Sequence, residues 1–270
     1  MLYDTHVHST ISTDASDTAE AVAKAALAKG LTGICFTDHL DLFDPKVIGQ
    51  KREGSYLAWQ KSYQAVANAR ACVGDKLEIL HGMELAEIHM DPVRAKDIVK
   101  ASPVDFVLGS LHMIAGHVDF CWMAYPNIDF CKDIMSLYLD EILQLANLDL
   151  ADSIAHIGYP LRYMVRHGFH VDIMDYQEQL RAIFTTMAQK GVGMEINTSG
   201  LRQGAGCTFP SLSALALYKA CGGEVVTIGS DSHTAQDVGS HLTEAKEMLE
   251  AVGFKYYTVF KARKPIYVTV

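Results

Sequence analysis

The sequence lacks any apolar run that approaches the roughly 18 residues of a membrane-spanning helix. Its amino terminus also lacks the basic segment followed by an apolar segment that marks a signal peptide, because the polar motif His6-Val7-His8 begins almost at once. We therefore expect a cytoplasmic protein that is neither exported by such a signal nor inserted in a membrane.

Positive charge is scarce. The chain has 23 lysines and arginines against 32 aspartates and glutamates, which gives a formal net charge of −9. Affinity for a nucleic-acid backbone comes from clustered Lys and Arg, so we expect no nucleic-acid groove. An anionic small-molecule substrate would need local positive charge, supplied by metal ions or by individual arginines.

Long linkers rich in Pro, Ser or Gly are absent, and the six cysteines include no Cys-x-x-Cys pair. We expect these cysteines to be small buried hydrophobes rather than disulfide partners. A chain of 270 residues with 49% hydrophobic residues is long enough for a full core. The sequence therefore predicts a single domain that spans residues 1–270.

The chain alternates between two hydrophobic periods. Strand-like runs cover residues 2–8, 32–37, 77–84, 106–112, 153–157, 192–197 and 224–230. Helical patterns cover 18–29, 56–73, 128–147, 174–190, 211–221 and 242–252, the first with Asp17 as its expected cap and most of them ending at a glycine. Seven strands alternating with helices imply a parallel sheet of the α/β class, most simply closed as a barrel.

Nine potential metal ligands recur at the ends of the strand-like runs: His6, His8, Asp14, His39, Glu84, His112, His156, Asp231 and His233. In a strand, residues i and i+2 point to the same face, so His6 and His8 can bind one ion, as can Asp231 and His233. The loops at the carboxyl ends of barrel strands form the active site. The pattern therefore predicts a polynuclear metal centre at that end of the barrel.

Several ordered motifs carry a family resemblance. They are Asp4-Thr5-His6-Val7-His8-Ser9, Phe36-Thr37-Asp38-His39, Gly82-Met83-Glu84, Gly109-Ser110-Leu111-His112, Ala155-His156 and Gly229-Ser230-Asp231-Ser232-His233. Over essentially the whole chain this set resembles the polymerase-and-histidinol-phosphatase (PHP) family. The segments 12–15, 33–39 and 195–202 look most like the histidinol-phosphate phosphatases within it. The resemblance implies a distorted seven-stranded (β/α)7 TIM-like barrel with a trinuclear centre.

The family pattern also implies how the ligands divide. His6, His8, Glu84 and Asp231 would bind a first ion, Glu84, His112 and His156 a second, and Asp14, His39 and His233 a third. Many family members have His where this chain has Asp14, and a carboxylate is an acceptable ligand for hard or borderline metals. A carboxylate can bridge two cations, which a neutral imidazole cannot, so Glu84 is the expected bridge.

The ligand types indicate the chemistry. Mixed imidazole and carboxylate ligands suit zinc, iron or manganese, and a bound divalent ion lowers the pKa of its water from about 15.7 towards about 7. Hydroxide then becomes available to attack phosphorus at neutral pH. We expect Glu84, Asp231, Arg162 and Arg202 to carry the catalysis, the last two as bidentate phosphate-binding groups.

Other residues near the strand ends allow more than one interpretation. His117 and Asp119 follow the fourth strand and can contact substrate or be ordinary loop residues. Asp38 is expected to orient a ligand rather than to act directly. His81, His89, His167, His170 and His241 are expected to be surface or hydrogen-bonded residues.

Three functions fit these observations. The first is hydrolysis of a small phosphomonoester, L-histidinol phosphate, in histidine biosynthesis, as the resemblance implies. The second is another phosphoesterase activity on the same scaffold, with nucleotides, oligonucleotides or phosphotyrosine as substrate. The third is an inactive metal-binding regulatory module, against which the intact ligand set argues. An amidohydrolase deaminase shares the His-x-His start but does not need the third set of ligands. The sequence leaves the metal identities and the oligomeric state open.

Overall fold

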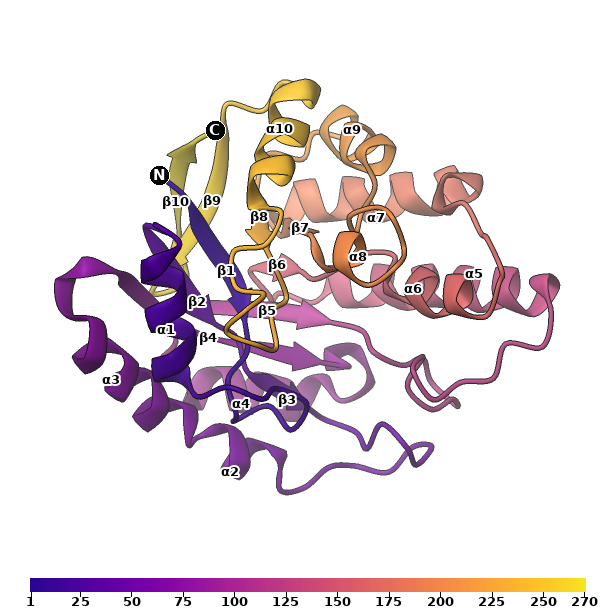
Figure 1. Cartoon of the computed structure of the whole chain (residues 1–270). Coiled ribbons are helices and arrows are strands. Elements are labelled where there is room, and N and C mark those ends of the chain that lie inside the picture. Colours follow the sequence, from indigo (N-terminus) through magenta and orange to yellow (C-terminus); the bar gives the residue numbers. More distant parts are fainter.

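The computed structural model describes residues 1–270 and contains one parallel sheet of eight strands (Figure 1). Besides the short β3 (His39–Asp41), seven strands lie side by side in this sheet. They are β1 (Tyr3–Val7), β2 (Gly33–Phe36), β4 (Glu78–Ala86), β5 (Phe106–Ser110), β6 (Ser153–Ile154), β7 (Gly193–Asn197) and β8 (Val226–Gly229). All seven coincide with the runs expected from the sequence. Their order in the sheet, β1-β2-β4-β5-β6-β7-β8, is the order along the chain.

The two edge strands of this sheet meet and close it. The Asp231 amide donates to the His6 carbonyl at 2.8 Å, and the His8 amide donates to the Ser232 carbonyl at 2.9 Å. The Thr5 hydroxyl donates to the carbonyl of Ile228 in β8 at 3.0 Å. The sheet is therefore a nearly closed (β/α)7 barrel, which confirms the predicted fold.

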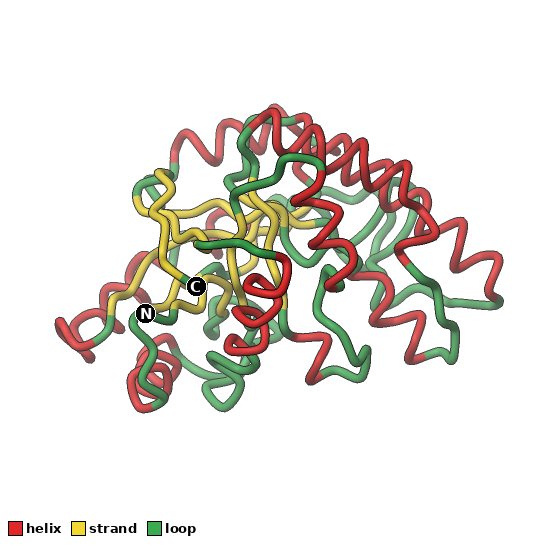
Figure 2. The backbone as a smooth tube through the Cα atoms, turned by 90° about the horizontal axis from the view of Figure 1, so that it is seen from above, coloured by secondary structure: helices red, strands yellow, loops and turns green.

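Helices cover the outside of the barrel (Figure 2). They are α1 (Ala19–Ala28), α2 (Ser55–Trp59), α3 (Ser62–Val73), α4 (Pro92–Ala101), α5 (Ile128–Asn147), α6 (Tyr159–Arg166), α7 (Gln177–Lys190), α8 (Ser199–Arg202), α9 (Leu212–Ala220) and α10 (Leu242–Val252), with short 3-10 turns at Gly74–Lys76, Ile88–Met90 and Ile173–Tyr176. The predicted helices all occur, and the bounds of α5 and α10 agree with the prediction. None of the helices combines the length and apolar character that a membrane crossing requires.

Some local predictions were wrong. Thr18 rather than Asp17 caps α1, because the Thr18 side chain accepts from the Ala21 amide at 3.3 Å. The Asp17 carboxylate instead accepts from the Ala235 amide at 2.8 Å, a contact between distant parts of the chain. The predicted helix 56–73 is divided into α2 and α3 at residues 60–61. The cysteines are unpaired, but Cys72 and Cys121 are exposed rather than buried.

A carboxyl-terminal hairpin was not predicted. It consists of β9 (Tyr256–Lys261) and β10 (Lys264–Thr269), paired antiparallel. The Tyr257 hydroxyl accepts from the Tyr3 amide at the start of β1, and the Phe260 ring stacks on Phe106 at the start of β5 with 5.3 Å between centroids. The hairpin therefore covers the amino end of the strands and leaves the carboxyl end open for the site.

Candidate metal centre

The nine predicted ligands come together at the carboxyl end of the barrel. His6 lies in β1 and His8 just after it, Glu84 lies in β4, and His39 begins a short strand, β3 (His39–Asp41), that pairs with β4. The others lie in loops: Asp14 before α1, His112 after β5, His156 after β6, and Asp231 and His233 after β8. The pairing register sets His39 directly opposite Glu84.

Glu84 lies at the middle of this cluster and is fully buried. Its Oε1 is 3.0 Å from His112 Nε2 and 2.9 Å from His156 Nε2. Its Oε2 is 2.9 Å from His39 Nδ1 and 3.2 Å from His6 Nε2. Burial by itself raises the pKa of Glu84, but His39, His6 and His112 outweigh burial and hold the pKa well below its ordinary value. Each oxygen of this carboxylate thus faces a different group of imidazoles.

A second carboxylate, Asp231, lies across from His6 and His8. Asp231 Oδ1 is 3.7 Å from His6 Nε2 and 3.5 Å from His8 Nε2, and these two nitrogens are 3.0 Å apart. Glu84 Oε2 is 3.4 Å from His8 Nε2. Burial raises the pKa of Asp231, but the nearby His6 and His8 hold it well below the ordinary range. Asp231 has a φ of +54°, a left-handed conformation that aims its carboxylate back at β1.

The third group lies at the outer rim of the cluster. Asp14 Oδ2 is 3.2 Å from His233 Nε2 and 3.5 Å from His39 Nε2, and these two imidazole nitrogens are 3.4 Å apart. The Asp14 side chain is 58% exposed, unlike the other two carboxylates. Partial burial raises the pKa of Asp14, but the hydrogen bonds and charges of His233 and His39 together outweigh burial and lower it below its ordinary value.

The protonation pattern of His6 and His8 fits a bound cation. His6 Nδ1 is 2.6 Å from the Glu195 carboxylate and must donate to it. His8 Nδ1 is 3.0 Å from Ser12 Oγ, whose own proton goes to Asp38 at 2.8 Å, so His8 Nδ1 is also a donor. A neutral imidazole that donates from Nδ1 has its lone pair on Nε2, and these two Nε2 atoms lie 3.0 Å apart. Two lone pairs at this distance repel unless a cation lies between them, so the donor set suits metal ions.

Two supporting carboxylates hold the imidazoles in place. Asp38 accepts from the Ser9 amide at 2.7 Å and from Ser12, which in turn bonds His8, as expected for an orienting residue. Glu195 in β7 was not predicted to have a role. Its Oε1 bonds His6 Nδ1, and its Oε2 accepts from the His156 amide at 2.8 Å.

Gly229 explains how Glu195 can lie this close to β1. A Cβ at Gly229 would collide with both His6 Cβ and Glu195 Oε1, so only glycine fits at the end of β8. A charged residue between Met194 and Ile196 of a buried strand was the signal in the sequence that Glu195 has a structural or functional role.

The two predicted arginines occupy different surroundings. Arg162 in α6 is 6% exposed, and its guanidinium is 2.5 Å from Ser199 Oγ and 3.4 Å from Asp231 Oδ2. It lines a cavity of about 250 Å³ together with Glu84, His112, His156 and Asp231. Arg202 does not line that cavity.

The guanidinium of Arg202 forms hydrogen bonds with the backbone. It donates to the Ser230 carbonyl at 2.8 Å and to the Asp231 carbonyl at 3.2 Å. The structure therefore places Arg162, but not Arg202, on the wall that faces the metal ligands.

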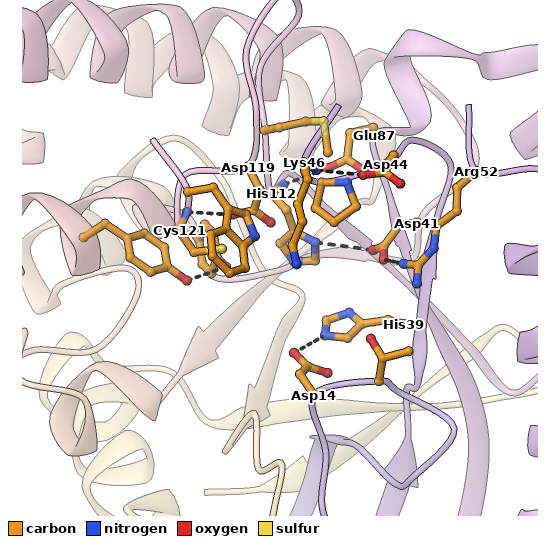
Figure 3. A pocket seen from close by; sticks show the side chains of 16 residues that line it. Asp14, His39, Asp41, Asp44, Lys46, Arg52, Glu87, His112, Asp119 and Cys121 are labelled. Carbon is orange, nitrogen blue, oxygen red and sulfur yellow. Dashed lines mark hydrogen bonds and ion pairs between the residues drawn. The ribbon is translucent and has the colours of Figure 1, made fainter. Parts of the chain in front are cut away.

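The two expected substrate contacts also differ. Asp119 is 8% exposed and lines a second cavity beside the cluster. His117 is half-buried and lines neither cavity. Asp119 thus faces the space beside the proposed metal ligands (Figure 3), and His117 does not.

The comparisons with known proteins agree with this geometry. A family profile described as the PHP domain matches residues 4–199. The chain belongs to the PHP family. The matched segment contains seven of the nine PHP-type donors described above, from His6 to His156, and ends before Asp231 and His233.

Several PHP relatives cover nearly the whole chain. It is 28% identical over 260 residues to a Clostridium acetobutylicum protein named "Probable histidinol-phosphatase", with 94% of this chain and 95% of that protein covered. It is 26% identical over 267 residues to the histidinol-phosphatase of Lactococcus lactis subsp. lactis, with 97% and 95% covered.

Solved structures establish the fold independently. The crystal structure of histidinol phosphate phosphatase from Lactococcus lactis subsp. lactis, complexed with zinc, L-histidinol and phosphate, matches with a TM-score of 0.79, 24% identity and 98% of each chain covered. A crystal structure described as the "putative histidinol phosphatase hisK from Listeria monocytogenes" matches with a TM-score of 0.77 at 19% identity, covering 90% of this chain and 99% of that one.

Proposed function

We propose that this chain hydrolyses L-histidinol phosphate to L-histidinol and inorganic phosphate, a step of histidine biosynthesis that takes place in the cytoplasm. The observation that carries this proposal is the convergence of nine nitrogen- and oxygen-donor residues, with Glu84 at their middle and the Arg162 guanidinium beside them. Relatives of nearly the same length, named histidinol-phosphatases, support the choice of substrate. Residues 1–270 would act as one PHP-type domain.

The donor set suits three divalent ions, zinc, iron or manganese. His6, His8, Glu84 and Asp231 would hold one, Glu84, His112 and His156 another, and Asp14, His39 and His233 the third. When bound, such ions activate water and neutralise negative charge on a phosphoryl group. Glu84 would join the first two of these sites, because its Oε2 faces His6 and its Oε1 faces His112.

Arg162 would bind the phosphoryl group of the substrate. Burial by itself lowers the pKa of Arg162, but Asp231 holds it above the ordinary value, so the side chain keeps its positive charge. Ser199 Oγ and the rings of Tyr159 and Phe209, 4.9 and 5.4 Å from the guanidinium carbon, restrict its position. A fixed and permanently charged guanidinium is suited to charge-assisted hydrogen bonds with phosphate oxygens.

Asp231 would connect this arginine to the metal ligands. Its Oδ1 faces His6 and His8 while its Oδ2 faces Arg162. Arg202 would contribute from behind, because its bonds to the carbonyls of Ser230 and Asp231 hold the loop that carries this carboxylate. Of the two proposed substrate contacts, Asp119 would meet the leaving alcohol, since it lines the cavity beside the ligands, whereas His117 would have to move to do so.

A phosphate-release assay tests the proposal. The purified protein, with its metals measured by elemental analysis, is assayed with L-histidinol phosphate, a nucleoside monophosphate, phosphotyrosine and an aryl phosphate. We expect kcat/KM for L-histidinol phosphate to exceed the others by at least about tenfold. A preference for a nucleotide or for phosphotyrosine would indicate another PHP phosphoesterase, and no hydrolysis by fully metallated protein would indicate a regulatory module.

A further inference from the structure

Two of the proposed metal ligands, Asp231 and His233, lie in one loop between β8 and α10, at residues 230–239. We call this segment the ligand loop. It lies at the seam where the two edge strands of the barrel meet, because the Asp231 amide donates to the carbonyl of His6 in β1 at 2.8 Å. The position of both ligands therefore depends on how the loop is held against β1.

One buried carboxylate, that of Asp4 in β1, bonds both ends of the ligand loop. Its Oδ1 accepts from the Ser230 amide at 2.8 Å, and its Oδ2 accepts from the Ser230 hydroxyl at 2.5 Å. The same Oδ2 accepts from the Gly239 amide at 2.7 Å. Asp4 is completely buried, so water does not compete for these bonds. Asp4 therefore fixes where the loop begins and where it ends.

The backbone of the ligand loop also depends on these contacts. Gly239 has a φ of +73°, which glycine adopts without strain, and a Cβ there would lie 3.0 Å from a methyl carbon of Leu31. Asp231 has a φ of +54°, a conformation that is unfavourable for a residue other than glycine and that surrounding contacts must maintain. The bonds to Ser230, the residue just before it, are among those contacts.

The same arrangement occurs a second time, on the neighbouring strands. Asp38, after β2, accepts from the Ser9 amide at 2.7 Å with Oδ1 and from the Ser9 hydroxyl at 2.9 Å with Oδ2. Ser9 follows the ligand His8, as Ser230 precedes the ligand Asp231. In both places a buried carboxylate accepts from both donors of a serine that adjoins a metal ligand after the next strand of the barrel. The repetition indicates a common role.

We propose that Asp4 is a positioning residue of the metal centre, which holds Asp231 and His233 in place by bonding both ends of the ligand loop. The inference rests on the metal centre of the proposed function. Its first and third sites each take a ligand from this loop. The second site, formed by Glu84, His112 and His156, takes none, so a defect in the loop should leave that site intact.

Asparagine cannot replace the Asp4 carboxylate in this role. Its side chain has one acceptor oxygen, and the NH2 group at the other position would face a backbone N–H, which is also a donor. One end of the ligand loop, at Ser230 or at Gly239, would then lose its bond. The residue that supports a metal ligand through such bonds typically contributes about ten- to a hundredfold to metal affinity.

Zinc binding tests the proposal. The metal-free parent, Asp4→Asn and Ser230→Ala are equilibrated with zinc over a series of chelator concentrations, and bound zinc per chain is measured by elemental analysis. Asp105→Asn is the matched control, because Asp105 likewise accepts from two backbone amides of distant segments, those of His81 and Ala262, but at the amino end of the barrel. The melting temperature of each metal-free protein is measured in parallel.

In Asp4→Asn, zinc at the two sites that use the ligand loop should bind about ten- to a hundredfold more weakly, while the remaining site keeps its parental affinity. Ser230→Ala removes only the hydroxyl donor and should show a smaller loss at the same two sites. It decides the question if Asp4→Asn does not fold. Asp105→Asn should lower the melting temperature and leave zinc binding unchanged.

Parental zinc affinity at every site in the folded variants would overturn the inference. An equal loss at all sites, or the same loss in Asp105→Asn, would also overturn it, because either result indicates a general defect of folding. A parent that binds no zinc would instead refute the proposed metal centre itself, on which the inference rests.

Discussion

The carboxylate of Glu84 is the group on which the charge interactions of the site converge. Four imidazoles lie within 3.2 Å of its two oxygens. A buried carboxylate is stable as an anion only where positive charge compensates it. In this protein that compensation would come from the bound metal ions rather than from four protonated histidines.

Replacement of Glu84 by alanine tests this role. We expect Glu84→Ala to lose the metals of both sites that it would join, and with them nearly all hydrolysis, because a shared ligand cannot be replaced by water alone. Elemental analysis and kcat measured side by side would show the loss. His170→Ala is the control, since His170 is exposed and makes no hydrogen bond. Parental metal content and turnover in Glu84→Ala would rule out the bridging role.

A second prediction at the scale of one residue concerns Glu195. Its two oxygens accept from His6 Nδ1, the His156 amide and Asn197 Nδ2. A glutamine offers one acceptor and one donor, so Glu195→Gln cannot satisfy all three donors. We expect an affinity for metal about ten- to a hundredfold weaker, measured by competition with a chelator. Unchanged affinity, with an unchanged melting temperature of the metal-free protein, would show that Glu195 does not orient His6.

The arginines can be separated from the metal ligands by kinetics. Arg162→Ala should lower kcat/KM for the phosphomonoester by about ten- to a hundredfold while the metals are retained, because a charge-assisted hydrogen bond to phosphate is lost. Arg202→Ala should cost about tenfold through the loop that it holds. Arg181→Ala, at an exposed position of α7, is the control. Full activity in both Arg162→Ala and Arg202→Ala would remove the arginines from the proposed mechanism.

At the scale of the elements, the seven strands and the larger helices could be predicted because their signals are local. Apolar runs of the right length are bounded by glycine or polar residues, and Gly30, Gly191 and Gly253 follow helices with positive φ as their positions indicate. The ligands could be predicted because each follows a strand, and the carboxyl ends of barrel strands lie together. Helix α4 was missed although it has a usable signal, since Asp91 caps it just before Pro92.

The remaining elements depend on contacts between distant residues. The hairpin turns at Ala262 and Arg263, which both have positive φ without being Asn or Gly, so the usual hairpin signal is absent. The bonds that Glu195 accepts from His6 and from the His156 amide, and the unpaired oxygen of Glu87, arise only when segments far apart in the sequence are brought together. The direction of the Arg202 side chain likewise depends on the loop after β8, which the sequence does not specify.

The packing of α2 and α3 on β4 predicts that the stability of the folded protein depends on pH. His81 is buried, stacks on Trp59 at 5.4 Å and bonds the Ser62 hydroxyl at 2.7 Å. Burial lowers the pKa of His81 to about 4, below its value of about 6.5 in an unfolded chain. Between pH 6.5 and 4 the unfolded chain therefore binds a proton that the folded protein does not, so stability falls as the pH falls through this window.

Urea unfolding of the metal-free protein measures this effect. From pH 7 to pH 4 the free energy of unfolding of the parent should fall by about 3 kcal/mol more than that of His81→Gln, which has no titrating group at this position. Any loss of packing in the variant is present at both pH values and cancels in the comparison. Equal decreases in the two proteins would contradict the prediction, because they would mean that His81 takes up its proton at the same pH in the folded protein as in the unfolded chain.

At the scale of the whole molecule, the two ends of the barrel have different roles: one end is closed by packing and the other carries the site. The hairpin closes the amino end through Tyr257 and Phe260, while the carboxyl end carries the charged cluster and both cavities. The chain has a net charge of −9, so its few buried cations matter more than its overall charge for binding a phosphate. Arg162 and the proposed metal ions would supply that positive charge at one end of the barrel.

The most direct test of this account is the number of metal ions per chain in the active protein. Elemental analysis of purified protein, followed while a chelator is titrated against phosphate release, should give up to three divalent ions per chain and a loss of hydrolysis as they are removed. Nine convergent donors are too many for one ion, which has four to six ligands. Full activity in protein with at most one bound metal, or activity that survives complete chelation, would contradict the polynuclear centre.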